Sequence, residues 1–165
     1  MVRTLDLVRH ATAMENYGSQ KDIDRELTAG GIRHAVILGK YLKSTGNAPK
    51  MIISSNAQRA KHTAMLLADC MHYNEDLVSI NDDLYNASIR VLLDAINNFD
   101  DKLDQILMVA HNPGISYLVE YLTGEQVGSM HPGGISRLSF EGNWKDISQN
   151  SCNLFYYKEP ESLLI

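Results

Sequence analysis

Residues 4–10 read Thr-Leu-Asp-Leu-Val-Arg-His, a short apolar run that stops at two basic side chains. The run has the length of a β-strand, and segments with helical periodicity separate it from later runs of similar length. The apolar runs lie at residues 4–8, 51–54, 77–80 and 106–110. This alternation predicts an α/β fold, arranged as a three-layer α/β/α sandwich around a mostly parallel sheet.

Two of these runs predict the centre of the sheet. Residues 51–53 (Met-Ile-Ile) and 106–110 (Ile-Leu-Met-Val-Ala) are continuously apolar and do not alternate with polar residues. Strands that are buried on both faces of a parallel sheet have this pattern. We therefore expect both runs to be interior strands, with two further strands at residues 136–140 and 153–157.

Capping residues predict where the helices begin and end. Thr28 is a suitable N-cap for a first helix, because a threonine side chain can accept a hydrogen bond from a free helical N–H group. Helical spacing places Ile32, Val36, Gly39 and Leu42 on the apolar face of that helix. We expect a second helix from about Ala57, a third over residues 89–96 after the cap Ser88, and a fourth with Asn112 as cap, Pro113 as first residue and Gly124 after its end.

Length and composition limit the possible classes of protein. With 165 residues, of which 44% are hydrophobic, the chain is expected to form one domain over residues 1–165. Its formal net charge of −5 and its lack of a basic run argue against a nucleic-acid partner. The N-terminus lacks the pattern of a signal peptide, and no apolar run approaches the ~20 residues of a membrane span. These features predict a cytoplasmic protein that does not bind membranes.

Basic residues and histidines follow three of the predicted strands. Arg9 and His10 come after the first, Arg59 follows the second, and His111 follows the run at residues 106–110. In an open α/β sheet, ligands bind beyond the carboxyl ends of the strands. Guanidinium groups match the oxygens of a phosphoryl group, and a neutral imidazole can carry that group covalently. We therefore predict a phosphoryl-transfer site, in which a backbone carbonyl would accept the hydrogen bond that orients the nucleophilic imidazole.

These motifs resemble those of a known family. Arg9-His10-Ala11, residues 55–60 (Ser-Asn-Ala-Gln-Arg-Ala) and His111 are similar to the motifs of the histidine phosphatase superfamily, also called phosphoglycerate mutase-like. The compact length and residues 24–28 (Asp-Arg-Glu-Leu-Thr) look most like the SixA branch. Members of that branch remove phosphate from phosphohistidine on signalling proteins. The resemblance implies a phosphohistidine carrier protein as the partner, with a small phosphorylated metabolite as the alternative.

The resemblance also implies roles for individual residues. His10 would be the nucleophile, Arg9 and Arg59 would clamp the phosphate, and His111 would stabilise the transition state. Arg25 matches a further phosphate contact of the SixA type, although an ion pair with a neighbouring acidic residue explains it nearly as well. Asn112 and Asn16 are weaker candidates for phosphate contacts, and a turn accounts for Asn16 equally well.

The sequence departs from the family pattern at two places. Ala11 replaces the usual glycine after the first histidine, which narrows the room for backbone approach. Leu84-Tyr85-Asn86 lies where larger members carry a glutamate that protonates the leaving oxygen, and an asparagine cannot act as an acid. This difference favours a phosphorus–nitrogen bond as the one that is cleaved, because imidazole leaves more easily than an alkoxide. Alternative acids are Asp82, Asp83 and Glu26.

Other readings of the same residues remain open. A small-molecule phosphomonoesterase would use the same fold with one of those carboxylates as its acid. A non-catalytic domain would bind a phosphorylated ligand without forming a covalent intermediate. A metal hydrolase is disfavoured, because there is no His-Glu-x-x-His motif and two arginines would repel a divalent cation. We expect neither a metal nor an organic cofactor. The Pro-Gly-Gly turn after His131 could border the pocket, but a loop position without a role in the site is the favoured interpretation of His131.

Overall fold

The computed structural model describes residues 1–46 and 48–163, which contain a six-stranded sheet in the order β3-β2-β4-β1-β5-β6. Strands β3, β2, β4 and β1 are parallel, whereas β5 is antiparallel to both β1 and β6. The predicted mostly parallel sheet is confirmed, and β2 and β4 are interior strands as expected. The strands are β1 (Val2–Arg9), β2 (Met51–Ser55), β3 (Ser79–Asn81), β4 (Gln105–Ala110), β5 (Ile135–Glu141) and β6 (Asn153–Lys158).

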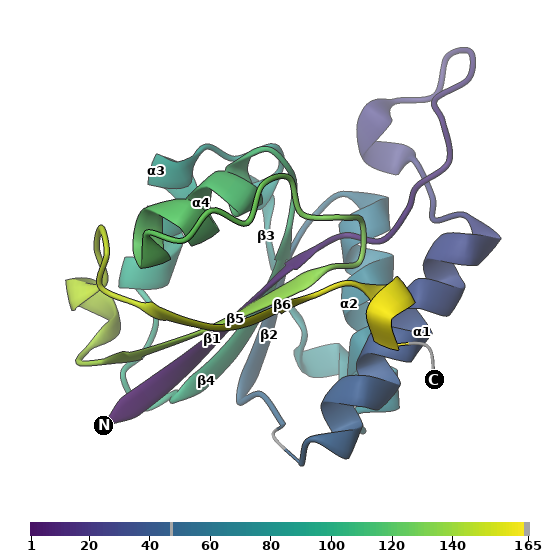
Figure 1. Cartoon of the computed structure of the whole chain (residues 1–165). Helices are drawn as coiled ribbons and strands as arrows, with labels where there is room; N and C mark the ends of the chain where they lie inside the picture. The colour runs from purple at the N-terminus through teal and green to yellow at the C-terminus, as the bar shows by residue number, and fades with distance from the viewer. Residues whose placement is uncertain (47, 164–165) are drawn as a thin grey trace.

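Helices cover both faces of the sheet, which gives the three layers of the sandwich (Figure 1). Successive residues of a strand point to opposite faces, and β1 accordingly contributes Leu7 to one apolar core and Val8 to the other. The core around Val8 is completed by α1 and α2, and the core around Leu7 by α3 and α4. The helices are α1 (Ala29–Ser44), α2 (Gln58–Cys70), α3 (Ile89–Asn97) and α4 (Gly114–Thr123). Short 3-10 turns are η1 (Asp22–Asp24), η2 (Glu75–Leu77), η3 (Asp82–Leu84), η4 (Trp144–Asp146) and η5 (Pro160–Leu163).

Most of the predicted helix ends are present. The Thr28 hydroxyl accepts a hydrogen bond of 2.9 Å from the Gly31 N–H, and Ser88 accepts one from the Val91 N–H. Gly124 ends α4 in the left-handed conformation, with φ of 74°. These contacts satisfy N–H groups that the first turn of a helix leaves free.

The predicted start of α4 is wrong. The helix begins at Gly114, and Pro113 occupies the cap position instead of the first helical position. The Asn112 side chain does not cap the helix. Its Oδ1 atom accepts a hydrogen bond of 2.5 Å from the Ser116 hydroxyl, and its Nδ2 atom donates to the Ser129 hydroxyl and the Met130 carbonyl, at 3.0 and 3.2 Å. Asn112 therefore ties the start of α4 to the loop before β5.

The predicted apolar face of α1 is only partly right. Gly39 and Leu42 are buried as expected, whereas Ile32 and Val36 are only half-buried. Small residues account for the difference, because α1 packs closely against α2. A Cβ atom on Gly39 would lie 2.6 Å from the Cβ atom of Cys70. The buried residues of α1 are Gly31, Ala35, Leu38, Gly39 and Leu42.

A buried ion pair joins two strands at the centre of the sheet. Asp6 of β1 lies opposite Arg137 of β5, and the guanidinium donates two hydrogen bonds of 2.7 and 2.8 Å to the carboxylate. Both residues are buried, and the two-pronged geometry compensates the charge that each brings into the interior. The polar residue inside the first apolar run is thereby accommodated. Within residues 1–46 and 48–163, no helix has the length and apolar character needed to cross a bilayer.

Candidate active site

The carboxyl ends of β1, β2 and β4 meet at one edge of the sheet. Val8, Val109 and Ser54 lie side by side in the register of these strands. The residues that follow this row are therefore brought together, as the sequence predicts. The rings of His10 and His111 lie 5.1 Å apart between their centroids.

Two hydrogen bonds fix the His10 imidazole. Its Nδ1 atom lies 2.7 Å from the Ala11 carbonyl oxygen, and its Nε2 atom accepts a bond of 3.3 Å from Arg59 Nε. A guanidinium N–H only donates, so Nε2 carries the lone pair and Nδ1 carries the proton. Burial lowers the pKa of His10 to about 4, with smaller contributions from the positive charges of Arg59, Arg9 and Arg25 and a partly opposing one from the Ala11 carbonyl. The imidazole is therefore neutral at physiological pH, with the lone pair of a nucleophile.

Arg59 lies in the first turn of α2 and is almost fully buried. Besides its bond to His10, its Nη1 atom donates to the Asp22 backbone carbonyl at 2.8 Å. Its Nη2 atom donates to Asp22 Oδ2 at 3.1 Å. The guanidinium also lies over the Tyr85 ring, 5.8 Å from its centroid. The position of this cation is thus fixed by contacts on several sides.

His111 is buried at the end of β4. Its Nε2 atom lies 2.8 Å from the Ser55 hydroxyl, which also accepts a hydrogen bond from the Ala57 N–H. Burial lowers the pKa of His111 to about 3, with smaller contributions from the neighbouring His10, Arg59 and Arg9 and an opposing one from the Asp22 carboxylate. Its Nδ1 atom is buried and has no hydrogen-bond partner in the part of the chain that the structure describes. A buried polar atom of this kind is ready to bind a ligand.

Arg9 is positioned by the turn that contains His131. Its Nη1 atom donates to the Met130 carbonyl at 2.7 Å, while its Nε atom is buried and unpaired among residues 1–46 and 48–163. The Gly133 N–H donates to the carbonyls of Arg9 and His10. The backbone of this turn therefore borders the site, which is the alternative that the sequence left open, whereas the His131 side chain lies 3.5 Å from Glu159.

Asp22 and Tyr85 also belong to the site, and sequence reasoning assigned neither of them a role in it. The Asp22 carboxylate pairs with Arg25 at 3.0 Å and with Arg59 at 3.1 Å, and it accepts a hydrogen bond from the Tyr85 hydroxyl. The hydrogen bond from Tyr85 and the two guanidinium groups lower the pKa of Asp22 to about 2, against an opposing effect of burial. Asp22 is thus an anion at the centre of a cationic cluster. In the sequence, the only indication of this contact was the position of Asp22 three residues before Arg25, a spacing that allows an ion pair.

Comparison with known proteins agrees with this geometry. The model of the histidine phosphatase superfamily (branch 1) matches residues 5–88, about half of the chain. The chain belongs to this superfamily. The chain is 28% identical to an uncharacterized Mycobacterium leprae protein, over 84% of this chain and 89% of the relative. An uncharacterized protein of Mycobacterium tuberculosis is 27% identical, over 93% of this chain and 99% of the relative.

Solved structures share the fold of this chain. A protein histidine phosphatase SixA in complex with tungstate superposes with a TM-score of 0.84 at 18% identity, covering 98% of this chain and 99% of that one. A mutant phosphoserine phosphatase from Entamoeba histolytica superposes with a TM-score of 0.71 at 17% identity, covering 98% and 100%. A mycobacterial glucosyl-3-phosphoglycerate phosphatase gives 0.70 at 19% identity, covering 94% and 98%. The phosphoglycerate mutase-like fold is thereby confirmed.

The three weaker candidates for phosphate contacts differ from one another in their surroundings. Arg25 makes the alternative ion pair with Asp22, yet its charge also reaches His10 and lowers the pKa of that imidazole. Asn16 is exposed, and no hydrogen bond connects it to the site within the described residues. The Asn112 amide is already engaged in the loop before β5. Arg25 and Asn112 both lie beside site residues, since Asn112 donates to the Met130 carbonyl that also accepts from Arg9, whereas Asn16 makes no such contact among the described residues.

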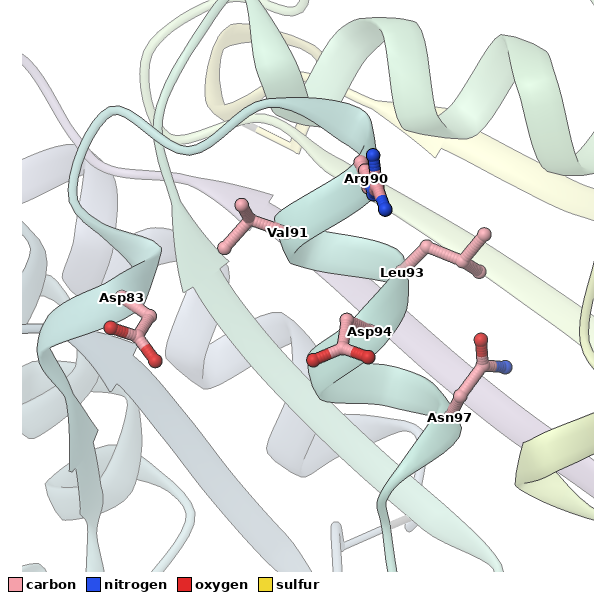
Figure 2. A pocket seen from close by; sticks show the side chains of 6 residues that line it. All are labelled: Asp83, Arg90, Val91, Leu93, Asp94 and Asn97. Atoms are coloured by element: carbon pink, nitrogen blue, oxygen red, sulfur yellow. The ribbon is translucent and has the colours of Figure 1, made fainter.

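Within the described residues, no hydrogen bond or ion pair joins the alternative acids to His10, whose ring nitrogens contact the Ala11 carbonyl and Arg59. Asp82 and Glu26 are exposed. Asp83 lines a hollow along α3 together with Arg90 and Asp94 (Figure 2). Asn86 is exposed in the left-handed conformation, with φ of 48°, and its neighbour Tyr85 reaches the site instead. The ring of Tyr85 packs edge-on against His111, with the centroids 5.5 Å apart.

Side chains that could bind a metal ion lie elsewhere on the surface. His131, Glu159 and Glu161 each offer a ligand atom, and these atoms lie within 4.8 Å of one another. The side chain of His131 is 57% exposed. At His10 the neighbouring charges are guanidinium groups, which suit an anion and repel a metal cation.

Proposed function

We propose that this protein is a metal-independent phosphatase that works through a phosphohistidine intermediate on His10, with phosphohistidine on a protein as its substrate. One observation carries the proposal. The His10 imidazole is held neutral, with Nδ1 on a backbone carbonyl and Nε2 facing Arg59. Three guanidinium groups act on the same ring. This arrangement combines a nucleophile with the charges that a phosphoryl group requires.

In the first step, the lone pair of His10 Nε2 attacks phosphorus. A new nitrogen–phosphorus bond forms, the bond to the substrate's imidazole breaks, and that imidazole keeps the electron pair and takes a proton. Arg9, Arg59 and Arg25 bind the three outer oxygens, so that catalysis rests on positioning and electrostatic stabilisation. Arg59 Nε first turns from His10 to an oxygen, which frees the lone pair. In the second step, the oxygen of a water molecule forms a bond to phosphorus, the nitrogen–phosphorus bond of His10 breaks, and Nε2 recovers its electron pair. The protons of that water stay on the departing orthophosphate or pass to solvent.

His111 would stabilise the transition state from the opposite side of the site. It is neutral in the free protein, because burial and nearby positive charge lower its pKa. A doubly charged phosphoryl group raises the pKa of a histidine beside it. We infer that His111 takes up a proton with the substrate and donates a hydrogen bond to the phosphoryl group. The unpaired Nδ1 atom supports this role.

The proton donors near His10 support an imidazole leaving group. The alternative carboxylic acids make no hydrogen bond or ion pair with His10 among the described residues, and Asp22 is ionised because its pKa is about 2. Tyr85 is a poor acid, since its hydrogen bond to Asp22 raises its pKa. An alkoxide leaving group requires a ready proton, whereas the imidazole of phosphohistidine is a better leaving group. A sugar or alcohol phosphate is therefore the second choice of substrate.

Substrate comparison tests this proposal. Phosphate release would be measured from a phosphohistidine-bearing carrier domain and from a panel of sugar and alcohol phosphates at matched concentrations, with His10→Ala as the control. We expect a clear preference for the carrier and no release by the variant. Preference for a metabolite ester would overturn the choice of substrate, and wild-type release by His10→Ala would overturn the mechanism. Binding of a phosphorylated ligand without turnover would indicate a non-catalytic domain.

A further inference from the structure

In the free protein, an acidic side chain occupies the guanidinium groups that are proposed to bind phosphate. The Asp22 carboxylate contacts Arg25 through Oδ1 and Arg59 through Oδ2, at 3.0 and 3.1 Å. Tyr85 adds a hydrogen bond from its hydroxyl. Carboxylate and phosphoryl oxygens are both bound by guanidinium groups in the same two-pronged way. Asp22 therefore makes the contacts that a bound phosphoryl group would make.

The same contacts hold the nucleophile in a resting state. Both Nη atoms of Arg59 are bonded to Asp22, which directs Arg59 Nε at the lone pair of His10. That lone pair must be free before it can attack phosphorus. Release of Arg59 from Asp22 thus frees the cation and the nucleophile together.

The exposed fractions of the Asp22 and Arg59 side chains indicate which of the two moves when substrate binds. The Arg59 side chain is 5% exposed, whereas that of Asp22 is 42% exposed. Asp22 lies in η1, within the long segment that connects β1 to α1 and extends beyond the end of β1 (Figure 1). A displaced Asp22 carboxylate can reach water without leaving a buried charge behind. Asp22 is therefore the group that gives way, while Arg59 stays in the site.

We propose that Asp22 is an internal competitor for the phosphoryl site, which gives way to substrate phosphate and returns to displace the orthophosphate product. The inference rests on the proposed function, in which Arg59 and Arg25 bind the phosphoryl group. An internal competitor raises the apparent Kd of an external anion, because the intrinsic Kd is divided by the fraction of molecules in which the site is free. Asp22 would thereby prevent retention of the product by a site with three guanidinium groups.

Direct binding of orthophosphate tests this role without any need for turnover. The full chain would be titrated with orthophosphate by calorimetry as wild type, Asp22→Asn and Asp24→Asn. Asp24 is a matched control, since it is an exposed acid in the same turn and its side chain makes none of the contacts described for Asp22. We expect Asp22→Asn to bind orthophosphate about tenfold more tightly, the factor that two partly exposed ion pairs can supply. Asp24→Asn should stay within about twofold of wild type, since it loses only a distant, screened charge.

The direction in which Asp22→Asn changes the affinity for orthophosphate distinguishes a competing Asp22 from one that only positions the arginines. If Asp22 only positioned Arg59 and Arg25, Asp22→Asn would bind orthophosphate equally well or more weakly, and the proposal would be wrong while the proposed function stood. Circular dichroism would check folding, and Asp22→Ala would replace a variant that failed to fold. Absence of orthophosphate binding in all three proteins would overturn the proposed function and this inference together.

Discussion

At the scale of single residues, two buried neutral histidines make the stability of the protein depend on pH. The pKa values of His10 and His111 are lowered from 6.5 to about 4 and about 3. Between pH 6.5 and these values the unfolded chain binds protons that the folded protein excludes, so the free energy of unfolding falls as the pH is lowered. The contribution of the two neutral histidines to the free energy of unfolding is at its full value above pH 6.5.

We predict a loss on the order of 2 kcal/mol per histidine at about pH 5, relative to neutral pH. Urea unfolding at the two pH values would measure it. His10→Gln should lose about half of the pH dependence, because one of the two shifted groups is gone. Equal stability of the wild type at both pH values would contradict the assignment of two neutral, buried imidazoles.

Arg59 provides the second prediction at this scale. Arg59→Ala should lower turnover of a phosphohistidine carrier by about 10² to 10³, the effect of deleting one preorganised donor to the transition state. Arg59→Lys should recover little of it, because an ammonium group lacks the planar fork that binds two oxygens. Steady-state measurement of kcat would test both variants. A loss below about threefold for Arg59→Ala would assign Arg59 to an ion pair without a role in turnover.

At the scale of elements, the close approach of α1 to α2 depends on a glycine. A Cβ atom at position 39 would lie 2.6 Å from the Cβ atom of Cys70, whereas at Gly30 the nearest atom would lie at 3.6 Å. Gly39→Ala should lower the free energy of unfolding by about 1 to 3 kcal/mol through overpacking. Gly30→Ala should raise it by up to about 1 kcal/mol, because alanine favours the helix. Thermal unfolding would compare the pair, and equal shifts would contradict the proposed packing.

Sequence reasoning found most helix ends but not every helix face. Thr28, Ser88 and Gly124 were predictable, because capping depends on one residue and its immediate neighbours. The buried face of α1 was not predictable. Gly39 is buried because α1 approaches α2 closely at this residue, and a pattern of apolar side chains does not show such a contact. The Asn112 amide could be satisfied either by a cap or by a distant loop, and the loop before β5 is 17 residues away in sequence.

At the scale of the whole molecule, the meeting of Arg9, His10, Arg59 and His111 was predictable, because the carboxyl ends of parallel strands share one edge of the sheet. Asp22 was not, since the segment between β1 and α1 has no periodicity from which its path could be read. The pairing of Asp6 with Arg137 was equally hidden, because the two residues lie 131 positions apart. The sequence thus predicts residues that follow regular elements better than residues that a loop brings back to the site.

The central claim is that His10 Nε2 carries the phosphoryl group. The most direct test is rapid quenching of the wild-type protein during turnover of a radiolabelled phosphohistidine carrier, followed by mapping of the label by mass spectrometry. We predict an acid-labile phosphate on His10 that forms and decays at the rate of turnover, and none on His10→Ala. Label on His111, or turnover at full rate without labelled His10, would contradict the account.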